Sequence, residues 1–413
     1  AAVLFCGGLF RWLSFVAIAA VVAWSFKINA RLPHAGLGSD ERLLAVKVSR
    51  EGVVAVVEAD PDDRRILFNN TYTLGGSRAQ FNQERQALLP ILLHGSARRV
   101  ATLGVATGST VAGATLDPEV ERIDGIELSP LALEYADRYF SPFNRDVFRN
   151  PRVHFTAEDA RWAIARNRRS YDVVIGDLFL PWRTGEGRLY TREHFANVHA
   201  SLRPGGLFCQ WLPMFQLTHE QFDCIVRTFR TVFPDSLLVR GDFYVGMPIV
   251  GLIGGRTTGT IDWAKVGSSA ERVRFADDCH DPLLRHVEGI AMCIVGDLPA
   301  PPPGPMNTLS NGWLEWNAGR NIVGLREPWF VGVPYARYLR DIHESAERAF
   351  PASLQSAHAA GHYFLKLEVG KAAKLPAADQ LERETHLHLP AKMRHDEGAA
   401  WRYWPMRHRP KLP

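Results

Sequence analysis

The chain has 413 residues, of which 46% are hydrophobic and 22% charged, a composition that supports a globular protein with a sizeable core. The formal net charge is +4, and Lys and Arg are almost balanced by Asp and Glu, so the charge gives no reason to expect a nucleic-acid partner. The five cysteines are scattered and include no Cys-x-x-Cys pair. This pattern argues against a disulfide framework and a zinc site, so we expect no metal and a reducing compartment.

The first predicted element is a hydrophobic segment within residues 1–30. Trp12 to Phe26 is an uncharged, strongly apolar run, and Lys27 and Arg31 follow it. The run is shorter than the ~20 residues that a membrane-spanning helix needs, so a membrane helix, a signal peptide and a buried helix all stay open. Positive residues after the run favour a cytoplasmic position for the rest of the chain. We expect a membrane anchor with the remaining domains on the cytoplasmic side.

Residues 41–80 are predicted to form a small antiparallel β unit. Three short segments rich in β-forming side chains are separated by turn signals such as Asp60-Pro-Asp-Asp. These segments run from Leu43 to Val48, from Val53 to Glu58 and from Arg65 to Phe68.

From Arg99 apolar runs alternate with helical stretches, and residues 81–255 are predicted to form one Rossmann-like domain. Buried parallel strands read as continuous apolar runs of this kind. The alternation is typical of an α/β, doubly wound sheet with a ligand site at the carboxyl ends of its strands. The predicted strands are 100–105, 123–128, 153–157, 171–178, 207–212, 237–239 and 249–253, and the predicted helices include 130–139 and 219–233.

Residues 256–413 are less regular and are treated as a C-terminal extension of unknown role. Within them, the proline-rich stretch from Leu298 to Pro305 reads as a linker or an extended loop.

Two of the predicted strands end in residues suited to a nucleoside. Gly104-Val-Ala-Thr-Gly108 follows the first strand, where glycines let the backbone approach a ligand and the next helix offers free N–H groups. An ordinary tight turn would have the same sequence. Glu127 ends the second strand about twenty residues later, where an acid can accept both hydroxyls of a ribose. The loop lacks the full Gly-x-Gly-x-x-Gly fingerprint, which argues against NAD.

Acidic residues end the next two strands as well. Glu158 and Asp159 follow the third strand, where an acid can meet an adenine amino group or can cap the helix that begins at Ala160. Asp177 follows the fourth strand at the mouth of the expected ligand crevice. It is either a catalytic base or a residue that caps the turn.

The ordered set of these strand ends resembles spermidine synthase and its relatives, the polyamine aminopropyltransferases, from about Leu67 to Gly255. The chain looks most like the bacterial branch in which a synthase-like domain is fused to membrane helices, which would place the anchor in the bacterial inner membrane. Further segments that resemble the family are Asn82-Gln83-Glu84, Leu89-Pro90, Asp177-Leu-Phe-Leu-Pro181, Leu189-Tyr-Thr-Arg-Glu-His-Phe195 and Arg203-Pro-Gly-Gly-Leu-Phe-Cys-Gln210.

The resemblance implies a role for each matched residue, with Asp177 as the catalytic base. The residues implied to bind the nucleoside co-substrate are Gln83, Gly104, Thr107, Gly108, Glu127, Glu158 and Asp159. Those implied to line the amine pocket are Thr73, Leu180 and Tyr244. The family carries Asp where Thr107 and Leu180 stand, Gln at Thr73 and Tyr at Asn82, so groups that hold cationic amines are partly lost.

The implied reaction transfers an aminopropyl group from decarboxylated S-adenosylmethionine to an amine such as putrescine and releases methylthioadenosine. The expected partners are this small amine, the membrane and a second copy of the chain. Leu180 should make the acceptor pocket less acidic. Two alternatives stay open. One is methyl transfer from intact S-adenosylmethionine, whose carboxylate Thr107 does not repel, and the other is a non-catalytic nucleoside-binding domain of a membrane protein.

Overall fold

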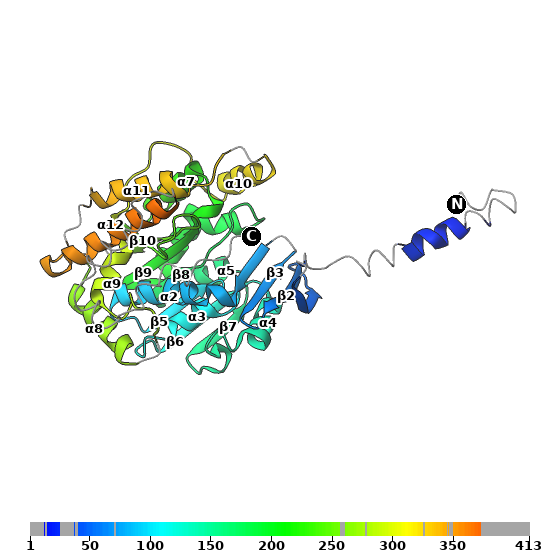
Figure 1. Cartoon of the computed structure of the whole chain (residues 1–413), viewed down its shortest axis with the longest axis horizontal. Helices are drawn as coiled ribbons and strands as arrows, with labels where there is room; N and C mark the ends of the chain where they lie inside the picture. The colour runs from blue at the N-terminus through cyan, green and yellow to red at the C-terminus, as the bar shows by residue number, and fades with distance from the viewer. Residues whose placement is uncertain are drawn as a thin grey trace.

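The computed structural model shows an α/β fold built on two β-sheets (Figure 1). A sheet of four strands, the small sheet, precedes a mixed sheet of eight strands, the large sheet. The predicted fold class, an α/β sheet preceded by a small antiparallel unit, is therefore confirmed. The residues that the structure describes are 12, 15–24, 37, 40–69, 72–256, 261–276, 279–324, 327–344, 346 and 350–372.

The small sheet is antiparallel, with its strands in sequence order. Its apolar face packs on the large unit: Val54 and Ile66 lie in one cluster with Tyr135 and Phe140 of helix α4. The sequence predicted the first three strands but not the fourth, which ends in two glycines and has a weak β signal. The strands are β1 (Arg42–Val48), β2 (Val53–Asp60), β3 (Asp63–Phe68) and β4 (Tyr72–Gly76).

The large sheet has the strand order β12-β10-β11-β9-β8-β5-β6-β7. The five strands β9, β8, β5, β6 and β7 run parallel to one another. β11 runs antiparallel to both β9 and β10, and β12 runs antiparallel to β10. The bounds are β5 (Arg99–Leu103), β6 (Arg122–Glu127), β7 (Val153–Ala157), β8 (Tyr171–Gly176), β9 (Leu202–Pro213), β10 (Ser236–Arg240), β11 (Ile249–Gly255) and β12 (Ile294–Asp297).

Helices cover both faces of the large sheet because successive strand side chains point to opposite faces. Val100 of β5 packs in the core with α2, α3, α8 and α9, whereas Ala101 and Leu103 pack in the core with α5, α6, α7 and α11. The helices are α2 (Gln80–His94), α3 (Ser109–Ala114), α4 (Pro130–Phe140), α5 (Ala160–Arg166), α6 (Arg192–Ser201), α7 (His219–Arg230), α8 (Trp263–Phe275), α9 (Val287–Cys293), α10 (Trp313–Gly324), α11 (Gly332–Glu344) and α12 (Ala352–Ala372).

The strand order reverses between β5 and β8. The chain leaves β5 toward β6 and β7 on one side and returns to β8 on the other. In open α/β sheets a ligand crevice forms at this switch point, beyond the carboxyl ends of the strands. The two strand ends meet closely here, since the Asp177 amide donates to the Leu103 carbonyl at 3.0 Å.

The described residues after 256 belong to the same folded unit. β12 extends the large sheet beyond β10, and α12 packs with α9 in the core of one face. The proline-rich stretch lies along α7, where the Arg227 guanidinium donates to the Pro302 carbonyl at 3.1 Å. Figure 1 shows α7, α10 and α11 together on one side of the molecule.

Part of the predicted membrane segment 1–30 lies outside the described residues, and residues 15–24 form a helix. The large apolar side chains of this helix are exposed, with Phe15 and Trp24 among them. Within the described part of the chain, no helix is both long and apolar enough to cross a membrane. Membrane attachment and the cytoplasmic position of the domains stay predictions.

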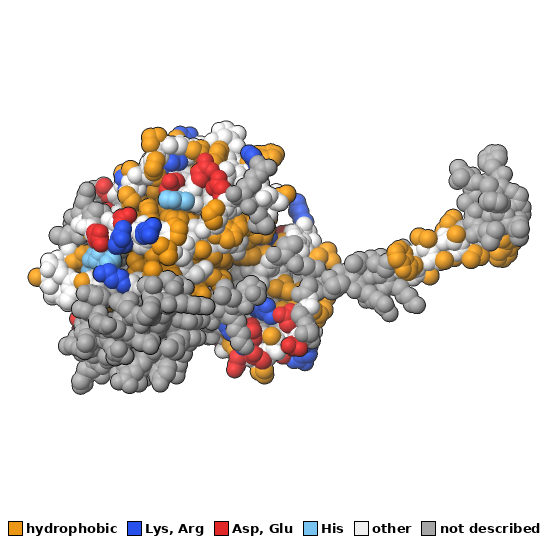
Figure 2. Space-filling model, turned by 45° about the horizontal axis from the view of Figure 1, so that its top comes forward, with side chains coloured by type: hydrophobic (Ala, Val, Ile, Leu, Met, Phe, Trp, Pro, Cys, Tyr) orange, Lys and Arg blue, Asp and Glu red, His pale blue; other side chains and the backbone are white. Residues whose placement is uncertain are grey.

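The surface carries both signs of charge. On the face drawn in Figure 2, acidic and basic side chains are interspersed among hydrophobic ones. This pattern agrees with the near balance of charges in the sequence.

Candidate functional site

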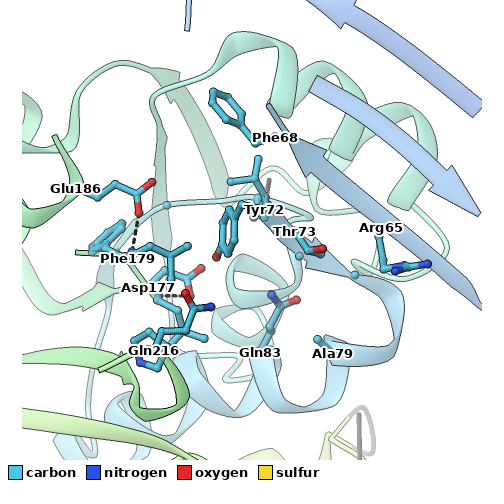
Figure 3. Close-up of a pocket in the computed structure, with 18 of the residues that line it drawn as sticks. Arg65, Phe68, Tyr72, Thr73, Ala79, Gln83, Asp177, Phe179, Glu186 and Gln216 are labelled. Carbon is cyan, nitrogen blue, oxygen red and sulfur yellow. Dashed lines mark hydrogen bonds between the residues drawn. The ribbon is translucent and has the colours of Figure 1, made fainter. Parts of the chain in front are cut away.

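A cavity of about 1970 Å³ lies between the small sheet and the carboxyl ends of the parallel strands (Figure 3). Pockets for one small molecule are typically ~300–1,000 Å³, so this cavity has room for two substrates at once. Of the predicted site residues, Thr73, Gln83, Gly104, Glu127, Asp159, Asp177, Leu180 and Tyr244 line it. Thr107, Gly108 and Glu158 lie outside its lining.

Gly104 brings the glycine loop against the opposite strand end. Its φ of +90° is in the left-handed region that favours glycine, and a Cβ here would lie 3.1 Å from the Cβ of Asp177. Gly108 has a φ of +88° and precedes α3, but it faces Asn144 behind the loop. The two glycines therefore have different roles. Gly104 allows the backbone to approach Asp177 in the cavity lining, and Gly108 forms the turn into α3.

Glu127 is fixed at the end of β6 by backbone donors. Its Oε2 atom accepts hydrogen bonds from the amides of Val105 and Ala106 at 3.0 and 3.2 Å. Its Oε1 atom accepts from the Ser129 amide at 3.1 Å. A carboxylate has about four acceptor positions, so this arrangement orients the group and leaves capacity for a ligand hydroxyl.

The two acids after β7 separate in the structure. The Glu158 carboxylate turns away from the cavity and pairs with Arg166, with one contact of 2.6 Å. Asp159 lines the cavity and also caps α5 by accepting from the Arg161 amide at 2.9 Å. Burial raises the pKa of Asp159, but the hydrogen bonds from Arg161 outweigh this and lower it overall. Asp159 therefore combines the capping role with a position in the cavity lining.

Gln83 and Thr107 form one buried contact beneath the cavity. The Thr107 hydroxyl donates to Gln83 Oε1 at 3.2 Å and lies 3.1 Å from the Ser109 hydroxyl. Thr107 is fully buried, so it positions Gln83 rather than facing a substrate. Thr73 lines the cavity from β4, in the small sheet.

Asp177 is the most perturbed of the predicted residues. Burial raises its pKa to about 6, and the charge of Glu127 adds to this, while hydrogen bonds oppose it. Those bonds come from the Leu178 amide to Oδ1 at 2.8 Å and from the Thr110 hydroxyl to Oδ2 at 3.3 Å. A carboxyl group that titrates near neutral pH can accept a proton from a substrate and release it again.

The loop after Asp177, residues 177–190, is called the gate loop here, and it carries a carboxylate that the sequence did not single out. Glu186 accepts from the Leu180 amide at 2.6 Å and pairs with Arg183 at 2.5 Å. Burial raises the pKa of Glu186, although the charge of Arg183 opposes this. Leu180 itself is buried. Leu180 stands where the family carries Asp. The gate loop nevertheless has a second acid besides Asp177, which is Glu186.

Two other lining residues, Tyr72 and Gln216, were not singled out by the sequence. Tyr72 lies beside Thr73 on β4, and burial together with the charges of Glu186 and Asp177 raises its pKa. Gln216 accepts from the Trp182 indole at 3.0 Å. Of the missed residues, only Glu186 could have been predicted from the sequence, because it is an acid in a loop that already contained the candidate base Asp177.

The far side of the cavity lies beyond the end of β10. Tyr244 lines it there, and its amide donates to the Asp242 carboxylate at 3.2 Å. Burial raises the pKa of Asp242 to about 7, against the lowering effect of Arg240. Trp329, from the region after residue 256, also lines the cavity.

The C-terminal region holds the gate loop from outside. The Gly185 amide donates to Glu315 of α10 at 3.2 Å, and the Asn307 side chain donates to the Gly187 carbonyl at 2.8 Å. These bonds flank Glu186 on both sides. The extension therefore contributes to the site through the position of this loop.

The cations around the cavity are already paired. Each of the lining arginines forms an ion pair with a carboxylate: Arg65, Arg78, Arg85, Arg161 and Arg183. Within the described part of the chain, Asp177 and Glu127 have no such ion pair. The part of the cavity at Asp177 and Glu127 is thus negative and suits a cationic ligand. No group of three potential metal ligands occurs among the described residues.

Comparison with known proteins supports the predicted resemblance. Residues 80–245 match the model of the spermine/spermidine synthase domain, which confirms it over this range. The polyamine aminopropyltransferase of Aeropyrum pernix is 27% identical over 189 residues, which are 45% of this chain and 60% of that protein. The polyamine aminopropyltransferase of Mycobacterium tuberculosis is 30% identical over 228 residues, 54% of this chain and 42% of that protein. The matches thus span about half the length of these curated relatives.

Solved structures with a similar chain path include two spermidine synthases. One, in complex with the transition state analogue AdoDATO, has a TM-score of 0.47 and 20% identity over 54% of this chain and 75% of that chain. The other, from Thermotoga maritima, has a TM-score of 0.46 and 15% identity over 77% of this chain and 88% of that chain.

Proposed function

Because residues 80–245 match the spermine/spermidine synthase domain, we propose that this chain transfers an aminopropyl group from decarboxylated S-adenosylmethionine to an amine. One observation carries the proposal. Asp177, a buried carboxyl group with a pKa of about 6, lies against Gly104 at the switch point of the sheet, in the same cavity as Glu127 and Asp159.

The nucleoside half of the donor fits the side of the cavity at β6 and β7. Glu127 is oriented by three backbone amides and keeps acceptor capacity for a ribose hydroxyl. Asp159 stands at the next strand end, where a carboxylate can accept from an adenine amino group. The sulfonium end of the donor then points toward β8 and Asp177.

The reaction is a displacement at the carbon beside the sulfonium. The amine nitrogen donates its lone pair to this carbon, the C–S bond breaks, and the sulfur keeps the bonding electrons as neutral methylthioadenosine. Asp177 takes the proton that the amine must lose before or during the attack. Holding the two substrates in line in one cavity supplies much of the remaining rate enhancement.

The charges favour the decarboxylated donor over intact S-adenosylmethionine. Thr107 is buried outside the cavity lining, so its lack of charge does not decide the matter. The reacting end presents the carboxylates of Asp177 and Glu127, and the lining arginines are engaged by other acids. These carboxylates would repel the carboxylate of intact S-adenosylmethionine. They would attract the ammonium group of the decarboxylated donor and that of the acceptor amine.

Product analysis tests this proposal directly. Purified protein is incubated with putrescine and either decarboxylated or intact S-adenosylmethionine, and the nucleoside product is identified by mass spectrometry. We expect methylthioadenosine from the decarboxylated donor. Release of S-adenosylhomocysteine from the intact donor would establish methyl transfer instead, and binding of both donors without any product would establish a nucleoside-binding domain.

A further inference from the structure

We propose that Glu186 holds the far ammonium of a diamine acceptor, while Asp177 meets the amine that reacts. This inference rests on the proposed function, because it assigns the acceptor half of the same cavity. It goes beyond the sequence interpretation, in which Leu180 left the gate loop with one acid fewer.

The position of Glu186 is fixed by its own loop. It follows Gly185, whose φ of +89° turns the chain, and begins a short 3-10 helix (Glu186–Tyr190). One carboxylate oxygen accepts from the Leu180 amide at 2.6 Å and the other pairs with Arg183 at 2.5 Å. Two of about four acceptor positions are therefore used, and the remaining ones can take an ammonium group.

Tyr72 links the two carboxylates. In Figure 3 the side chains of Tyr72, Asp177 and Glu186 converge on the same part of the cavity. All three residues line the cavity, and the charges of both acids raise the pKa of the Tyr72 hydroxyl. A short diamine can thus run past this ring, with one nitrogen at each carboxylate.

The wall at Glu186 already accommodates a cation. The Arg183 guanidinium lies over the rings of Phe68 and Tyr72, with 4.6 and 5.3 Å to their centroids. Aromatic faces at such distances attract ammonium as well as guanidinium groups. An acceptor ammonium beside Glu186 would meet the same rings.

The charge balance of this corner favours a dication. Glu127, Asp177 and Glu186 all line the cavity, and of these three acids only Glu186 forms an ion pair with a described residue, Arg183. The charge of Glu127 acts unfavourably on both other carboxylates. Buried carboxylates repel one another. A diamine with two positive charges therefore offsets the repulsion among these acids more fully than a monoamine does.

The test compares Glu186→Gln with the wild type in calorimetric titrations of protein saturated with methylthioadenosine. The ligands are putrescine and butylamine, which differ in the far ammonium. We expect putrescine to bind roughly 10- to 100-fold more weakly to Glu186→Gln, with butylamine binding unchanged. Glu121→Gln is the matched control, since Glu121 is 58% exposed and lies outside the cavity lining. Methylthioadenosine affinity and melting temperature establish that each variant is folded.

Several results would overturn the assignment. Equal putrescine affinity in Glu186→Gln and the wild type would do so, as would an equal loss for butylamine. A wild type that binds ornithine tightly and loses it in Arg183→Gln would show that the far group is a carboxylate held by Arg183. A misfolded Glu186→Gln is replaced by Glu186→Asp, which should also weaken putrescine selectively. Wild-type binding of both substrates without methylthioadenosine release would refute aminopropyl transfer and leave Glu186 as the ammonium site.

Discussion

The two halves of the cavity are built in different ways. The half proposed for the nucleoside consists of the ends of neighbouring parallel strands, where backbone amides orient Glu127 and the Arg161 amide and side chain hold Asp159. The acceptor half is assembled from β4, the gate loop and the C-terminal region, and side-chain pairs such as Arg183 with Glu186 hold it together. The position of the first half is set by the strand order of the large sheet. The side chains of the second half lie mostly on loops, so they can change while the fold is kept.

This difference gives the two halves separate experimental signatures. A change in the nucleoside half should alter the affinity for methylthioadenosine whatever the acceptor is. A change in the acceptor half should alter the use of amines and leave nucleoside binding intact. Asp177 stands at the border, between Gly104 of the glycine loop and Leu178 of the gate loop.

The largest effect is expected for Asp177→Asn. Asparagine keeps the shape of the side chain but cannot accept the proton of the amine, so kcat should fall by roughly 10²- to 10⁴-fold. Methylthioadenosine should bind as it does to the wild type. Initial rates and calorimetric titrations on one preparation check both statements, with Asp137→Asn, at a surface ion pair, as the control. A fully active, folded Asp177→Asn would exclude the residue as the base.

The same substitution should stabilise the ligand-free protein at high pH. The folded-state pKa of Asp177, about 6, lies above its ordinary value of 3.8, so its carboxylic acid form favours folding below about pH 4 and that contribution is lost as the pH rises through 6. Asparagine mimics the neutral acid, and a pKa of about 6 in place of 3.8 corresponds to ~3 kcal/mol of unfolding free energy at pH 8.

Urea unfolding at pH 4 and pH 8 measures this difference. We expect Asp177→Asn and the wild type to be similar at pH 4 and the variant to be more stable at pH 8. A variant that is less stable at pH 8 would mean that Asp177 is a structural capping residue.

Glu127→Gln should weaken the binding of methylthioadenosine by about 1.5–3 kcal/mol, because a charged acceptor for a ribose hydroxyl is lost. Glu158→Gln is the matched control, since its carboxylate pairs with Arg166 outside the cavity lining. Calorimetry with methylthioadenosine separates the two variants. Equal losses would mean that the structure assigns the nucleoside acids wrongly.

The smallest effect is expected for Glu315→Ala. It removes one hydrogen bond to the Gly185 amide, worth ~1 kcal/mol, so KM for the amine should rise by roughly threefold to tenfold. The affinity for methylthioadenosine should not change. Trp316→Ala on the same helix is the control, because this side chain is 75% exposed. An unchanged KM would indicate that the C-terminal region does not position the gate loop.

Much of the nucleoside half was predicted from the sequence because it depends on local rules. Continuous apolar runs identified the parallel strands, and the residues directly after Leu103, Ile126 and Gly176 had to meet at one edge of the sheet. Thr107 and Glu158 were placed at the nucleoside by the same reasoning, but the structure puts both outside the cavity lining. Position at a strand end does not fix the direction in which a side chain points.

The sequence by itself determined the α/β class, the small antiparallel sheet and the acids Glu127, Asp159 and Asp177 at the strand ends, because these follow from periodicity and from order along the chain. Only the tertiary structure decided that Tyr72 of β4 shares the cavity with Asp177 and Glu186, and that Glu315 accepts from the gate loop at Gly185. Those contacts join segments far apart in the chain, and no local pattern encodes them. Burial in the shared cavity then sets the pKa of Asp177, a property that its neighbours in sequence do not specify.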